Sequence, residues 1–196
     1  MEFHHLRKES DQMDIIEIVK SLYRSSAGSY LLLKYVNRGY WIDKLQEYFP
    51  NKYIDNLTEF NYDKCFSMYI NLSDNKGSIG TEEFDNYILE NENLYILSIK
   101  ISVLAPYCIF KYVRYYVDEE IKCETSSIPY CEEHMEFNKI INNFISDYHL
   151  ILLDDNTLMR EVSDICLELR EPPVSVYNCL FQDCYSYYPY SINKVE

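Results

Sequence analysis

The sequence predicts an α+β fold: an antiparallel β-sheet with a central hairpin, packed by several amphipathic helices. Residues 97–103 alternate apolar and polar side chains, and residues 107–117 form a return strand after a turn at Ala105 and Pro106, a pattern typical of a β-hairpin. Residues 132–146 repeat apolar side chains three and four positions apart, as a helix with one buried face does. Helical and strand segments alternate without an internal repeat, which favours the α+β class.

Two helices with a strand between them are predicted in the N-terminal part of the chain. Asp11 can cap the first helix, and Ala27 and Gly28 supply its stop. Residues 29–36 predict a short buried strand, with a helix as the alternative. The second helix ends before Pro50, because proline disfavours helical backbone in the residue that precedes it.

A strand, a turn and a third helix follow. Residues 65–72 alternate in the strand period, and residues 74–77 have turn-forming side chains. Thr81 is a typical N-cap, and the carboxylates of the next turn suit the positive end of a helix.

Beyond the hairpin, residues 118–130 are predicted as a loop that leads into the helix at 132–146. Three further short elements are predicted at residues 148–153, 165–169 and 174–181, the first two of them strand-like because apolar side chains recur there.

The 196 residues are predicted to form a single α+β domain, with a flexible leader at 1–10 and a peripheral tail at 184–196. No apolar run approaches the ~20 residues that cross a bilayer, and the start lacks the apolar core of a secretory signal. The seven cysteines are odd in number and lie in unrelated contexts, which favours reduced thiols. These features predict a cytoplasmic protein that does not associate with membranes.

The strongest compositional signal is 21 tyrosines in a chain of formal net charge −14. Tyrosine suits contact surfaces, and a negative surface attracts basic partners and repels nucleic acid. Residues 74–136 hold 13 acidic and 5 basic side chains, whereas residues 1–60 hold 9 and 8, so the acid is concentrated around the hairpin. This predicts a protein partner and no nucleic acid. The alternatives are a merely solvated face for the acid and a genome-wide composition bias for the tyrosines.

The sequence contains no convincing catalytic or ligand-binding motif. Its glycines are isolated and no serine lies in a nucleophile elbow, which disfavours nucleotide binding and serine hydrolysis. Cys123, Cys131 and His134 lack the paired spacing of a zinc site. A cysteine nucleophile would need His134 or His149 as its base. We therefore expect a protein without catalytic residues, metal or cofactor.

Parts of the C-terminal third resemble a known class of proteins. Residues 148–154, 165–169 and 174–183 are similar to small immunity proteins of bacterial polymorphic and contact-dependent toxin systems. The resemblance implies a protein that binds and neutralises a cognate toxin domain in bacterial competition, and it implies no particular fold. An acidic protein of this kind can occupy the basic cleft of a nuclease toxin as a phosphate mimic.

The candidate contact residues form an acidic group for steering and an aromatic group for anchoring. They are Glu82, Glu83, Asp85, Asp118, Glu119 and Glu120 in the acidic group, and Tyr112, Arg114, Tyr115 and Tyr116 in the aromatic group. One alternative is a viral or phage accessory protein that binds a host factor. A second is a small hydrolase that uses Cys and His or carboxylates, for which a deep pocket joining His134 or His149 to a cysteine or an acid would be the sign. The oligomeric state is left open.

Overall fold

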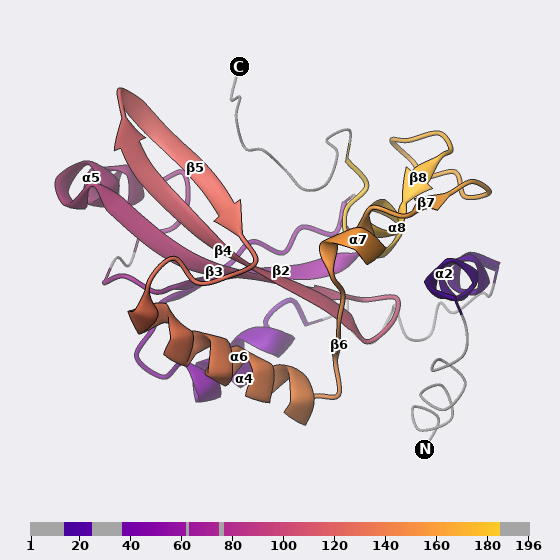
Figure 1. Ribbon diagram of the computed structural model, residues 1–196, viewed down its shortest axis with the longest axis horizontal. Coiled ribbons are helices and arrows are strands. Elements are labelled where there is room, and N and C mark those ends of the chain that lie inside the picture. The colour runs from indigo at the N-terminus through magenta and orange to yellow at the C-terminus, as the bar shows by residue number, and fades with distance from the viewer. Residues whose placement is uncertain (1–13, 25–36, 62, 75–76, 185–196) are drawn as a thin grey trace.

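The computed structural model describes residues 14–24, 37–61, 63–74 and 77–184, and it confirms the α+β fold class (Figure 1). The predicted leader, the Asp11 cap, the strand at 29–36 and the tail beyond Cys184 lie outside the described residues.

The main sheet has six strands. They are β1 (Ile54–Asn56), β2 (Cys65–Asn71), β3 (Asn93–Ser102), β4 (Tyr107–Asp118), β5 (Glu120–Ser126) and β6 (Ile151–Leu152). The first five are antiparallel in chain order, and β6 pairs parallel with the start of β4. The predicted central hairpin is β3–β4, whose register sets Asn93 opposite Tyr116 and Ile101 opposite Cys108.

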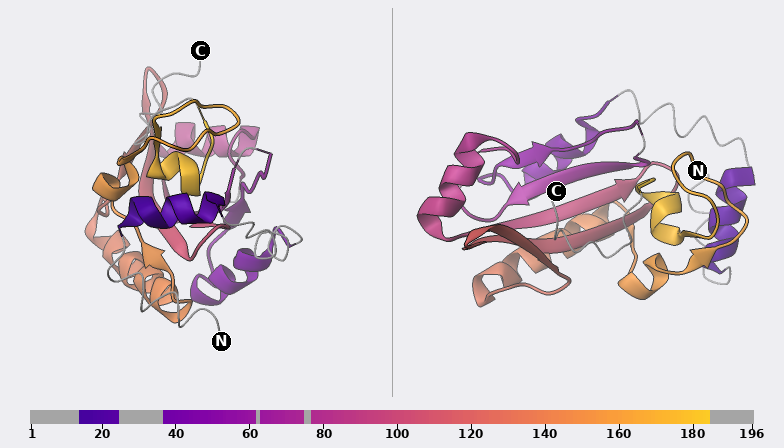
Figure 2. Two further views of the ribbon diagram at one scale, coloured as in Figure 1. Left: turned by 90° about the vertical axis from the view of Figure 1, so that its right-hand side faces the viewer. Right: turned by 90° about the horizontal axis from the view of Figure 1, so that it is seen from above.

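Helices cover both faces of this sheet (Figures 1 and 2). One face carries α4 (Tyr40–Tyr48) and α6 (Met135–Asp147), the latter preceded by the 3-10 helix η1 (Glu132–His134). On the other face, α5 (Glu82–Asn91) lies at one end. At the opposite end lie α2 (Ile15–Arg24), α7 (Asp155–Leu158), α8 (Val176–Leu180) and a small sheet of β7 (Glu161–Val162) and β8 (Val174–Ser175).

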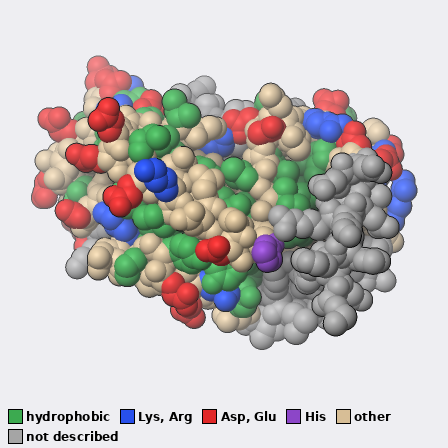
Figure 3. All heavy atoms as spheres, turned by 60° about the horizontal axis from the view of Figure 1, so that its bottom comes forward, with side chains coloured by type: hydrophobic (Ala, Val, Ile, Leu, Met, Phe, Trp, Pro, Cys, Tyr) green, Lys and Arg blue, Asp and Glu red, His purple; other side chains and the backbone are tan. Residues whose placement is uncertain are grey.

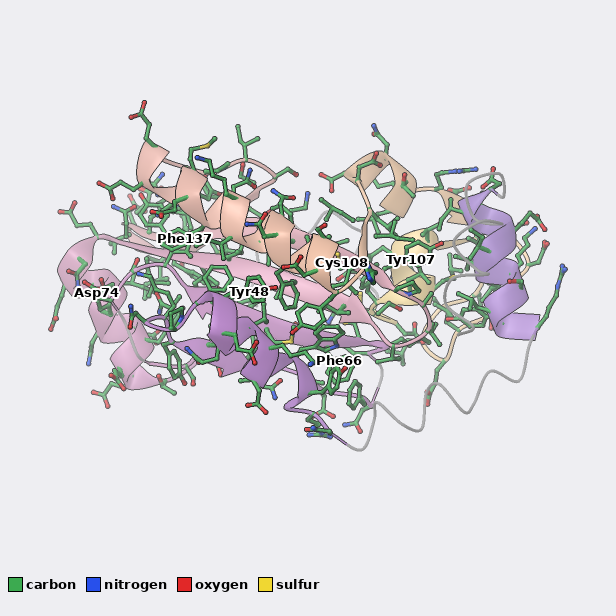
Figure 4. The ribbon with its side chains drawn as sticks, turned by 90° about the horizontal axis from the view of Figure 1, so that it is seen from below. Tyr48, Phe66, Asp74, Tyr107, Cys108 and Phe137 are labelled. Atoms are coloured by element: carbon green, nitrogen blue, oxygen red, sulfur yellow. The ribbon has the colours of Figure 1, made fainter. Side chains whose placement is uncertain are left out.

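Three hydrophobic clusters lie between the sheet and these three groups of elements. The largest lies between the sheet and α4 and α6, where Trp41 meets Phe144 edge-on at 5.8 Å between ring centroids. Figure 4 looks at this side and shows Tyr48 and Phe137 on the two helices in front of the sheet. The second cluster joins the C-terminal elements and α2 to the sheet, and the third lies beneath α5.

The best-patterned sequence predictions agree with these elements. The helix predicted before Pro50 is α4, the strand at 65–72 is β2, and the helix after Thr81 is α5. The predicted helix at 132–146 is formed by η1 and α6.

Two local predictions are wrong. Most of the segment 118–130, predicted as a loop, is strand β5, in which apolar Ile121 and Cys123 alternate with charged side chains. The alternating residues 165–169 do not form a strand; they lie in bends and turns, where Ile165 and Leu167 are buried in the second cluster. Burial can thus produce the strand period in sequence without strand pairing.

Candidate protein-binding surface

The acidic residues Glu82, Glu83 and Asp85 are held in place by the start of α5. Thr81 is the N-cap, and its Oγ1 accepts a hydrogen bond from the backbone N–H of Phe84 at 3.3 Å. Phe84 and Ile88 are one helical turn apart and face the third cluster. The three carboxylates are therefore directed to solvent, and all three residues are exposed beside the positive end of the helix.

A second acidic group lies at the turn between β4 and β5. Asp118 and Glu120 are paired across the turn, and Glu119 between them has a left-handed backbone (φ 62°). All three are exposed. Lys122 Nζ approaches Asp118 Oδ2 at 2.6 Å, and this hydrogen bond raises the pKa of Lys122. One of the turn's carboxylates thus has a basic neighbour, whereas no ion pair is seen for Glu119 or Glu120 among the described residues.

The fold brings the two groups to the same end of the sheet. The N–H of Val117 donates to the carbonyl oxygen of Glu92, just after α5, at 3.3 Å. Figure 1 shows α5 and the β4–β5 turn at one end of the molecule, and Figure 3 shows acidic side chains at that end of the face it presents. We call this surface the acidic end; its exposed carboxylates are Glu82, Glu83, Asp85, Glu90, Glu92, Asp118, Glu119 and Glu120.

Two apolar side chains are exposed within the acidic end. Leu89 on α5 is 58% exposed and Val117 near the end of β4 is 39% exposed. A partner that meets the carboxylates would therefore also find apolar contact area, which can contribute affinity that charge alone does not.

Tyr112 and Tyr115 are structural residues in this fold. Tyr112 is fully buried in the first cluster, where desolvation raises its pKa to about 12. Tyr115 lies on the opposite face of β4, with its ring edge-on to Phe84 at 5.1 Å beneath α5. Desolvation is also the largest cause of its raised pKa. The prediction that Tyr112 anchors a partner is not compatible with this burial, because its side chain presents no open contact face. Tyr115 is half-buried, and its role as an anchor stays a prediction.

Arg114 and Tyr116 remain partly exposed. The Nε of Arg114 donates to Asn93 Oδ1 at 2.8 Å, and its Nη1 lies 3.3 Å from Glu124 Oε1. Its guanidinium also lies over the Tyr116 ring, 5.0 Å from the centroid. Arg114 is therefore oriented by three neighbours, and of the aromatic group predicted from the sequence only Tyr112 is fully buried.

Sequence reasoning missed three parts of this surface. Glu90 and Glu92 contributed to the charge count for 74–136 but were not singled out, although Glu90 lies on the same helix as Glu82 and Glu92 directly follows that helix. The exposed Leu89 was missed because nothing in the helical period distinguishes it from a core position. The strand character of β5 was available in its alternating side chains.

One of the two histidines named for a hydrolase, His134, is packed among aromatic rings. His134 is 6% exposed, and its ring contacts Tyr95, Tyr112 and Phe137. A pocket of about 200 Å³ lies elsewhere, lined by Lys20, Tyr23, Arg24, Asp164, Ile165 and Cys166, without a histidine.

Four of the described thiols are poorly activated. Burial raises the pKa of the thiols of Cys65, Cys108 and Cys179 to about 12. Beside the pocket, the pKa of Cys166 is raised mainly by its hydrogen bond to Glu171. A thiolate nucleophile is disfavoured at all four positions.

Within the ranges that the structure describes, no group of three or more His, Cys, Asp or Glu side chains is arranged to hold a metal ion. In the same ranges, no helix has the length and apolar character needed to cross a bilayer. Comparisons of the chain with family models, curated proteins and solved structures find no match.

Proposed function

We propose that this chain is an immunity-type protein that binds a cognate toxin domain through its acidic end and neutralises it. The observation that carries the proposal is the meeting of two carboxylate groups, from α5 and from the β4–β5 turn, at one end of the sheet. Eight exposed carboxylates there offer a dense negative surface. Such a surface is complementary to the basic cleft of an enzyme that acts on nucleic acid.

We assign the charged and the apolar residues of this surface different physical roles in binding. The carboxylates attract a basic partner at long range and raise the association rate, because their charge is exposed and carried by rigid elements. Leu89 and Val117 then supply desolvated contact, and Arg114 and Tyr116 on β4 are proposed as further contact residues. The protein acts by occupying its partner and makes or breaks no covalent bond.

The role is tested by co-expressing this chain with the toxin domain that the proposal expects to be encoded beside its gene. We expect growth to be restored and a complex to persist through size-exclusion chromatography. Continued growth arrest together with separate elution of the two proteins would contradict the proposal.

The surface is tested by two variants that make the same change in total charge at different places on the molecule. The variant Glu119→Lys with Glu120→Lys is expected to lower the association rate constant about tenfold at low salt and to flatten its salt dependence. The matched control is Glu161→Lys with Glu168→Lys, which makes the same charge change on exposed residues near the opposite end. Association rates are measured by biolayer interferometry at several salt concentrations. Equal rates for the two variants would contradict the proposal that the acidic end binds the partner.

A further inference from the structure

Strand β5 forms an edge of the main sheet. In the sheet order it follows β4 and has no further strand beyond it among the described residues. It is seven residues long and carries Glu120, Lys122 and Glu124 between less polar positions. An edge strand with unpaired backbone groups is a site at which another strand can add.

The backbone bonds of β4 show which groups of β5 face outward. Val117 donates its N–H toward the β3 side, to Glu92, whereas the carbonyl of Cys108 accepts from Leu153 on the β6 side. Odd-numbered residues of β4 therefore bond toward β3 and even-numbered ones toward β5, since the direction alternates along a strand. Tyr116 and Arg114 pair with Lys122 and Glu124.

It follows that Lys122 and Glu124 direct their N–H and C=O groups toward β4, and that Ile121, Cys123 and Thr125 direct theirs away from it. Among the described residues no hydrogen bond is seen to these outward groups. The outer edge of β5 thus offers three N–H and C=O pairs to a partner strand.

We infer that β5 is the docking edge for a second copy of this chain, joined antiparallel about a two-fold axis at Cys123. In that register all seven residues are paired, and Lys122 of each copy lies opposite Glu124 of the other. Ile121 faces Thr125, and Glu120 faces Ser126. The pairing is self-complementary in charge, because each copy contributes one Lys and one Glu to the two cross-strand pairs.

Like-charge contacts would destabilise the two neighbouring registers of this β5–β5 pairing. An axis at Lys122 would set Lys122 opposite itself and Glu120 opposite Glu124, and an axis at Glu124 would set Glu124 opposite itself. Like charges directly opposite one another are destabilising. An axis at Cys123 also places the two acidic β4–β5 turns at opposite ends of the joined strands, about 20 Å apart at the rise of an antiparallel strand.

The backbone part of this inference is tested with two substitutions at Thr125, which is exposed. We expect the chain to dimerise at concentrations between about 10 and 500 µM, as a modest interface does. Thr125→Pro removes an outward N–H without removing a bond to β4, and should weaken the dimer at least about tenfold. Thr125→Val keeps the N–H and should dimerise like the parent.

The register is tested by charge exchange in analytical ultracentrifugation. Lys122→Glu and Glu124→Lys should each be mainly monomeric alone, because each places like charges opposite one another twice. An equimolar mixture of the two should form a heterodimer, in which every such pair is again Glu opposite Lys. The internal pairs with Asp118 and Arg114 stay broken in the mixture, so they cannot cause its recovery.

The matched controls are Lys139→Glu and Glu168→Lys, exposed positions outside β5 with the same charge changes. These should dimerise like the parent, alone and mixed. A parent chain that stays monomeric up to about 500 µM, or a mixture that stays monomeric, would overturn the inference and leave the edge to an extended segment of another protein. None of these measurements depends on a toxin partner.

Discussion

His134 is a buried titratable residue whose ring is packed among aromatic side chains. It is buried among Tyr95, Tyr112 and Phe137, and its Nδ1 has no hydrogen-bond partner in the part of the chain described. Desolvation is the largest influence on its pKa and lowers it; the nearby charge of Lys52 also lowers it, whereas that of Glu133 raises it. The neutral imidazole is therefore the form compatible with the folded state.

The pH dependence of stability follows from this shift. In the unfolded chain the histidine takes up a proton near its ordinary pKa of ~6.5, while the folded chain resists protonation. Stability from the neutral ring is thus complete above that pH and is lost as the pH falls below it. We expect the free energy of unfolding of the wild type, minus that of His134→Phe, to decrease from pH 7.5 to pH 5 in urea titrations. Because both proteins have the same carboxylates, this difference in unfolding free energy cancels most of their contribution to the pH dependence. A difference that does not change with pH would contradict the statement that His134 is buried in its neutral form.

Gly77 is required by close packing against the start of α5. A Cβ at this position would lie 2.7 Å from the backbone N of Phe84 and 3.1 Å from the carbonyl carbon of Glu83. Since backbone atoms cannot rotate away, Gly77→Ala should lower the free energy of unfolding by about 1–3 kcal/mol. Gly39→Ala is the control, because its Cβ would meet its nearest neighbour, Asn37 Oδ1, at an ordinary 3.5 Å. Equal denaturation midpoints for the two variants would show that the loop relaxes freely.

At the scale of elements, α5 depends on its N-cap. The Thr81 hydroxyl accepts from Phe84 N–H and donates to the carbonyl of Ser78 at 2.7 Å. Thr81→Ala should cost about 1 kcal/mol of unfolding free energy, whereas Thr81→Ser keeps the hydroxyl and should cost much less. Thermal unfolding followed by circular dichroism measures both. If the alanine variant were as stable as the serine variant, tertiary packing of Phe84 and Ile88 alone would hold the helix.

Helices and strands with a clear side-chain period could be predicted from the sequence. Elements that depend on strand pairing or burial against distant residues could not. The β3–β4 hairpin, α4 and α6 have clear periodicity, and Pro106 and Pro50 mark the hairpin turn and the end of α4, so short-range chemistry predicts them. The side chains of strand β5 do alternate, but three of its seven residues are charged, as suits an exposed edge, so the segment resembles a polar loop. The apolar alternation at 165–169 is misleading, because those side chains are buried without strand pairing.

For the molecule as a whole, charge and packing divide the surface into regions with separate tests. The acidic end is formed by α5 and the β4–β5 turn, whereas the proposed dimer edge runs along β5 from that turn. Moving charge at Glu119 and Glu120 should alter association with a basic partner. Reversing the charge at Lys122 or at Glu124 alone should weaken self-association, so failure of one proposal leaves the other standing.

The sequence by itself determined the α+β class, the central hairpin, the capped start of α5 and the excess of acid around the hairpin, because these depend on neighbours a few positions apart. Only the tertiary structure decided that Tyr112 is buried and that α5 covers Tyr115. It also decided that carboxylates more than thirty positions apart in the chain lie at one end of the sheet. The burial of these tyrosines and the position of these carboxylates depend on which helix covers which face of the sheet. The packing of helices on the sheet is determined by the summed burial of many side chains and not by a local sequence pattern.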